Sequence, residues 1–153
     1  MKFASTDGEL VVYATLKLQR ALTAFLIAGI SVFVPAVADD VSGVNRFVCA
    51  PAQVNICDEF GSCVSVMPWE VNVPRFLVFD LKKKHIATTE ASGENRSTPI
   101  QSIINKDDAI YLQGVEGGRA FSFVINKSTG FMSAAIAREF LTVTGFGACT
   151  PSK

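Results

Sequence analysis

Four cysteines, Cys49, Cys57, Cys63 and Cys149, are the side chains with the clearest chemistry in this sequence. Their spacing matches no zinc-binding pattern, and the C-x-x-C pair that redox enzymes use is absent. An even number of cysteines in a small exported domain indicates disulfide bonds, and four cysteines allow three pairings. The pairing Cys57–Cys63 with Cys49–Cys149 is favoured, because the first pair flanks a turn and the second would join the first strand to the last. The sequence alone does not choose among the three.

His85 is the only imidazole in the chain and follows three lysines, Lys82, Lys83 and Lys84. A catalytic histidine needs a partner that orients it, and cationic neighbours do not supply one. A solvated hairpin end explains this stretch better than a catalytic set. We therefore predict a protein that is not an enzyme, with no catalytic residue, no metal site and no cofactor.

A polar loop is the best candidate for binding. It combines hydroxyl, carboxylate, amide and guanidinium groups within Ser92, Gly93, Glu94, Asn95 and Arg96. Polar loops on rigid β scaffolds often carry binding, although ordinary hairpin loops have a similar composition. We predict a binding loop here, whose partner is an unknown protein or small molecule.

A second glycine-rich stretch, Gly114–Arg119, resembles a phosphate-binding loop only in its glycines. A phosphate loop needs a helix N-terminus after it, whereas this stretch lies between two apolar, strand-like segments. The sequence therefore predicts a hairpin turn at this point.

Composition places these residues in one small domain. The chain has 153 residues, of which 49% are hydrophobic and 18% are charged, with 14 basic and 14 acidic side chains. A disordered chain would contain fewer apolar residues, and a nucleic-acid-binding protein would normally carry a basic excess. We therefore expect one folded domain and no nucleic-acid partner.

The N-terminal region has the layout of a secretory signal peptide. Lys17 and Arg20 precede an apolar run over residues 21–38, which ends in the small-x-small site of Ala36 and Ala38. We predict cleavage after Ala38, so that residues 39–153 form a periplasmic or secreted domain with no stable membrane span. An uncleaved anchor is the alternative. The acidic residues within the first nine positions are unusual for a signal peptide, so the true start could lie downstream.

Short stretches of alternating apolar residues recur about every ten residues after position 45, with turn signals between them. No helical pattern of crossover length separates these stretches, so the strands should pair in an antiparallel manner. The sequence predicts an all-β fold, a small antiparallel up-and-down barrel of about eight strands. A two-sheet sandwich is the alternative.

Two resemblances accompany this pattern. The stretches Val71–Phe76 and Ser92–Arg96, with the ending Phe146-Gly147-Ala148-Cys149-Thr150, resemble small exported bacterial proteins of unknown function. In plan the chain is also similar to the periplasmic inhibitors of c-type lysozyme, which are small disulfide-linked antiparallel barrels. That similarity implies that Ser92-Gly93 and Gln113-Gly114 would face a lysozyme cleft, with Gln113 standing where the family has lysine.

Together these features predict an exported, non-enzymatic binding or interaction module. A lysozyme-inhibitor-like protein and a carrier of small apolar ligands are the alternatives. The interaction module should have a filled barrel, whereas the carrier should expose Trp69 or several phenylalanines to an internal pocket.

Overall fold

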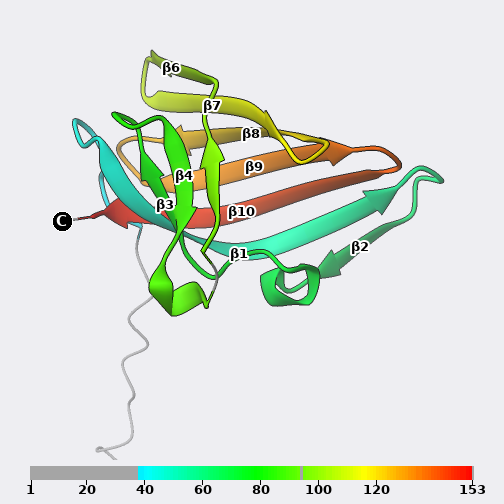
Figure 1. Cartoon of the computed structure of the whole chain (residues 1–153). Helices are drawn as coiled ribbons and strands as arrows, with labels where there is room; N and C mark the ends of the chain where they lie inside the picture. Colours follow the sequence, from blue (N-terminus) through cyan, green and yellow to red (C-terminus); the bar gives the residue numbers. More distant parts are fainter. Residues whose placement is uncertain (1–37, 94, 153) are drawn as a thin grey trace, which may run out of the picture. The chain divides into compact units, whose positions relative to one another are not determined.

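The computed structural model describes residues 38–93 and 95–152, so the predicted signal peptide lies almost wholly outside the described residues. These residues form a ten-stranded antiparallel sheet that curls into a half-barrel (Figure 1). The all-β prediction is confirmed.

The elements in chain order are β1 (Arg46–Asp58), β2 (Cys63–Val66), the 3-10 helix η1 (Pro68–Val71), β3 (Leu77–Asp80), β4 (His85–Thr88), the 3-10 helix η2 (Glu90–Ser92), β5 (Ser97–Pro99), β6 (Ser102–Lys106), β7 (Ala109–Glu116), β8 (Arg119–Asn126), β9 (Phe131–Arg138) and β10 (Leu141–Pro151).

Most neighbours in the sheet are also neighbours in the chain. The order is β5-β4-β3-β1-β10-β9-β8-β7-β6, with β2 attached to β1. The first and last strands are therefore paired, and Figure 1 shows β10 (red) beside β1 (cyan). The ends of this path, β5 and β6, are joined by a corner at Ile100 and Gln101. The Ile100 N–H donates to the Lys84 carbonyl (2.8 Å), and the Gln101 N–H donates to the Gln113 carbonyl (2.9 Å), which holds the sheet curled.

Strand β1 bends in its middle, and its two halves pair with different strands on one side. Arg46–Cys49 pairs with β3, Val54–Cys57 pairs with β2, and the register with β10 shifts between Pro51 and Gln53. Proline cannot donate to a sheet ladder, so a bulge is a natural place for it.

Strand β10 has a glycine opposite this bulge. A Cβ on Gly147 would lie 2.5 Å from the Ala50 carbonyl oxygen and 2.8 Å from the Met132 methyl group. The absence of a side chain at Gly147 therefore lets β1 and β9 approach β10 closely, as the curvature of the sheet requires.

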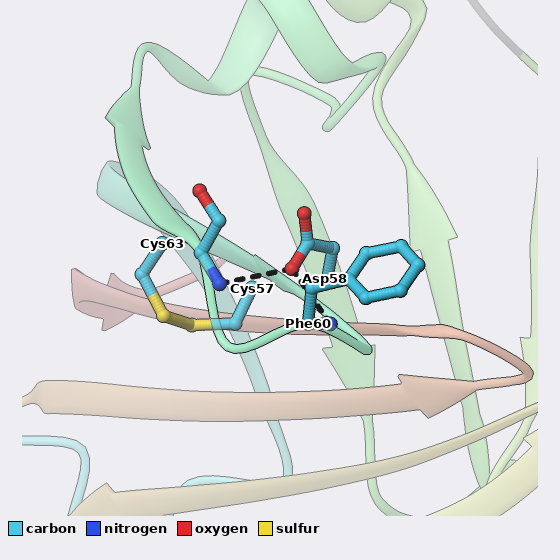
Figure 2. The surroundings of a disulfide bond; sticks show 5 residues. Cys57, Asp58, Phe60 and Cys63 are labelled. Carbon is cyan, nitrogen blue, oxygen red and sulfur yellow. Dashed lines mark hydrogen bonds between the residues drawn. A yellow bond between two sulfur atoms is a disulfide. The ribbon is translucent and has the colours of Figure 1, made fainter.

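Two disulfide bonds have the pairing that the sequence favoured. Cys49 and Cys149 are register partners in β1 and β10, and both are buried, so this bond crosses the centre of the sheet. Cys57–Cys63 closes the β1–β2 hairpin. Beside it, the Asp58 carboxylate accepts hydrogen bonds from the backbone N–H groups of Phe60 (3.0 Å) and Ser62 (2.9 Å), as Figure 2 shows.

The core lies where β3 and β4 face β7 and β8. Phe47 stacks on Phe79 with ring centroids 5.3 Å apart, and Phe79 meets the edge of Phe123 at 5.2 Å. Ile110, Leu112 and Ile125 are almost completely buried around these rings. The core therefore fills one part of the half-barrel and leaves another part of its concave face open.

Candidate functional site

The open part of the concave face forms a groove of about 330 Å³. This volume lies at the lower end of the range of small-molecule sites, about 300–1,000 Å³. Its mainly apolar lining includes Ile56 from β1, Phe121 and Phe123 from β8, Ala134 and Ile136 from β9, and Val143 from β10.

Period-two alternation on paired strands creates this lining. Phe121 on β8 lies opposite Ile136 on β9, and Phe123 lies opposite Ala134. Successive side chains of a strand point to opposite faces, so both pairs face inward while the residues between them face outward. Ile136 and Val143 remain half-buried, which leaves apolar surface open along the groove.

One end of the groove is charged. The charged side chains in its lining are Arg96, Glu116, Arg119 and Arg138. Glu116 accepts a hydrogen bond from the Thr98 hydroxyl (2.5 Å) and lies 3.4 Å from the Arg119 guanidinium. With three arginines and one glutamate, the lining has a net positive charge, and its acidic group is already paired.

Among the described residues of the predicted binding loop, only Arg96 lines this groove. The Ser92 hydroxyl lies 3.3 Å from both the backbone N–H and the carbonyl of Phe76, and 3.1 Å from the Thr89 hydroxyl. Gly93, with φ of +70°, ends helix η2 by donating its N–H to the Glu90 carbonyl. Ser92 and Gly93 thus make hydrogen bonds within the chain, and neither residue lines the groove.

Arg96 is the member of the predicted loop that reaches the groove. Its backbone exchanges hydrogen bonds with Thr88, and its guanidinium donates to the Asn72 carbonyl (3.2 Å). Asn95 is exposed, and Glu94 lies outside the described residues. The role of this loop in binding remains a prediction, and Arg96 is its best-placed residue.

The remaining candidates lie elsewhere in the sheet. His85 begins β4 opposite Asp80, whose carboxylate accepts a hydrogen bond from the Lys83 N–H, and this bond lowers the pKa of Asp80. Gln113 and Gly114 lie inside β7 and not in a turn. Within residues 38–93 and 95–152, no group of three or more His, Cys, Asp or Glu side chains is arranged to hold a metal ion.

The aromatic residues named for a carrier's pocket divide between the groove and the solvent-exposed surface. Phe121 and Phe123 line the groove, whereas Trp69 lies in η1, is 64% exposed and is not among the lining residues. Within the glycine-rich stretch, Gly117 and Gly118, at φ of +56° and +73°, form the predicted hairpin turn, while Gly114–Glu116 belongs to β7 and Arg119 begins β8.

No family model matches this chain, and no curated protein or solved structure matches it significantly. In the part of the chain that the structure describes, no helix has both the length and the apolar character needed to cross a membrane.

Sequence reasoning missed two groove residues, Arg119 and Arg138. A local signal existed, because Arg119 is spaced two and four residues from Phe121 and Phe123, and Arg138 is spaced likewise from Ile136 and Ala134. This spacing puts each arginine on the apolar face of its strand. The local sequence could not predict that the two arginines are register partners, because this depends on how β8 pairs with β9.

Proposed function

We propose that this protein is an exported, non-enzymatic binding module that holds a small apolar ligand on the concave face of its half-barrel. The single observation that carries the proposal is the open apolar groove beside a well-packed core. Contiguous apolar surface is costly to leave in water, and a concave apolar site with a few polar groups is the usual form of a ligand site. The groove favours a carrier over an interaction module with a filled barrel.

The two disulfide bonds support the proposed export, because such bonds form and persist in oxidising compartments. The basic residues, apolar run and Ala36-x-Ala38 site at the N-terminus support the same conclusion. We expect protein recovered from the periplasm or the medium to have the mass of residues 39–153 with four oxidised cysteines. Four free thiols, measured by alkylation of the denatured protein, would contradict the proposal.

Binding can be tested with the neutral fluorophore N-phenyl-1-naphthylamine, which brightens in apolar sites. The oxidised protein should enhance its fluorescence in a saturable manner, and unlabelled apolar ligands should displace it. Native mass spectrometry of freshly purified protein should also reveal any ligand that remains bound. A protein that neither enhances the fluorescence nor carries an added mass would argue against the carrier function.

Adjacent alanines on β9 provide a matched pair of variants. Ala134 lines the groove, whereas Ala135 is exposed and alternates to the other face of the strand. Ala134→Phe should fill part of the groove and weaken binding of the fluorophore, while Ala135→Phe should leave it unchanged. Circular dichroism checks that both variants fold. Equal weakening by the two substitutions would place the fluorophore outside the groove.

A further inference from the structure

We propose that the groove selects amphiphiles with an anionic head group, which Arg119 and Arg138 bind at one end while the tail lies along the apolar floor. This inference rests on the proposed ligand-binding function and specifies the chemistry of the ligand. It assigns roles to two residues that the packing of the fold does not explain.

The two arginines occupy paired positions in the groove lining. Arg119 on β8 and Arg138 on β9 are register partners, and both line the groove. Like charges directly opposite each other in an antiparallel pair are unfavourable. A bound anion between the two guanidinium groups would turn this repulsion into two charge-assisted interactions.

The guanidinium groups of the two arginines differ in their partners. Arg119 contacts the Glu116 carboxylate at 3.4 Å, and this carboxylate also accepts the Thr98 hydroxyl. The Arg138 guanidinium has no hydrogen-bond or ion-pair partner among residues 38–93 and 95–152. The nearest acidic group in the lining is thus already engaged, and the guanidinium of Arg138 is available to a ligand.

The side chains along the groove change from apolar to cationic. From the core outward, the inward positions read Phe123, Phe121, Arg119 on β8 and, opposite them, Ala134, Ile136, Arg138 on β9. Two steps of two residues span about 14 Å at the rise of an antiparallel strand. The site is therefore apolar over most of this length and cationic at one end, which complements an amphiphile with one anionic head.

The test compares three probes with the same ten-carbon tail: decanoate, decyl phosphate and decanol. Each displaces N-phenyl-1-naphthylamine from the oxidised protein at low ionic strength. At least one of the anions should bind about tenfold more tightly than decanol, and added salt should reduce this preference. The ratio between decanoate and decyl phosphate then identifies the preferred head group.

Variants of Arg138 test whether this residue causes the preference for anionic probes over decanol. Arg138→Gln should remove most of the preference for the anions and leave decanol binding unchanged, and Arg138→Lys should retain part of it. Arg75→Gln, at an exposed position that does not line the groove, is the matched control and should bind as the wild type does.

The failures of the two proposals are distinguishable. Equal binding of decanol and both anions by the wild type would overturn the anion inference and leave the apolar groove as the ligand site. A preference for the anions over decanol that persists in Arg138→Gln would likewise overturn the anion inference and leave the apolar groove as the ligand site. If the fluorophore binds but none of the three probes displaces it, the anion inference fails and the apolar groove remains the ligand site. If the fluorophore does not bind and no added mass is found, the ligand-carrying function fails as well.

Discussion

Arg119 and Arg138 lie directly opposite each other on β8 and β9, 19 residues apart in the chain and on the same face of the sheet. Their positions follow the same alternation that turns Phe121 and Ile136 inward, so the register that builds the apolar floor also brings two cations together. The packing of the unliganded protein gains no stability from this pair of like charges. A bound anion would give the pair a function, as proposed above.

The stability of the unliganded protein should rise when this pair is broken. Arg138→Gln removes a like-charge cross-strand pair, and the Arg138 guanidinium has no partner among residues 38–93 and 95–152 to lose, so we expect the free energy of unfolding to increase by about 0.2–1 kcal/mol. Urea unfolding at low ionic strength measures the change, with Arg75→Gln as the control. A less stable Arg138→Gln protein would mean that Arg138 supports the fold.

The two disulfides should differ in how much they contribute to the free energy of unfolding. Cys49–Cys149 closes a loop of about 100 residues and should contribute about 4–5 kcal/mol on the chain-entropy model, while Cys57–Cys63, with a sequence separation of 6, should contribute less than about 3 kcal/mol. Paired Cys→Ala variants, compared by denaturant unfolding, test this order. If the Cys57–Cys63 variant is the less stable of the two, loop length does not govern their contributions.

Because the strands approach closely at the bulge, replacing either of two glycines of β10 by alanine should cost different amounts of stability. A Cβ on Gly147 would lie 2.5 Å from the Ala50 carbonyl oxygen, whereas a Cβ on Gly145 would lie 3.1 Å from the carbonyl oxygen of Gln53. Gly147→Ala should therefore destabilise the protein by about 1–3 kcal/mol, and Gly145→Ala by less. Thermal unfolding of the two variants tests the order, and equal midpoints would contradict it.

A turn residue next to the groove carries backbone strain. Phe140 joins β9 to β10 with φ of +63° and an exposed side chain, a conformation that costs bulky residues about 1–2 kcal/mol and glycine almost nothing. Phe140→Gly should leave stability unchanged or raise it by up to about 1 kcal/mol. Phe60→Gly, at an exposed turn position where φ is not positive, is the comparison and should not stabilise. A clear loss in Phe140→Gly would reveal packing of the ring that its exposure does not suggest.

Acid should reduce the stability that one hydrogen-bonded carboxylate, Asp108, contributes to the fold. The Ser128 hydroxyl (2.5 Å) and the Asn126 side-chain amide (2.9 Å) donate to Asp108, and these bonds hold the pKa of Asp108 below its usual value. A lowered pKa in the folded state contributes stability above the pKa of the unfolded state, and this is lost as the pH falls through the folded pKa. The wild type should therefore be more stable than Asp108→Asn at neutral pH, and the gap should narrow below about pH 4. A gap that stays constant across this range would contradict the prediction.

Local features of the sequence determined the class of fold. Alternation at Phe121, Phe123 and Ile125 and the glycines of the β7–β8 turn predicted antiparallel strands and a hairpin, because strand periodicity and turn geometry are properties of a few consecutive residues. The disulfide pairing that joins Cys49 to Cys149 followed from expecting the first strand beside the last, and the structure confirms it.

Tertiary structure decided what the strands enclose. The curled antiparallel sheet agrees with the predicted barrel, and the tertiary structure adds that it is a half-barrel whose concave face holds an open groove. It also decided that Arg119 pairs in register with Arg138 and that the Ser92 hydroxyl lies within hydrogen-bond distance of the Phe76 backbone. Each of these depends on the register between segments distant in the chain, and register is set by the packing of whole faces, which no local pattern records.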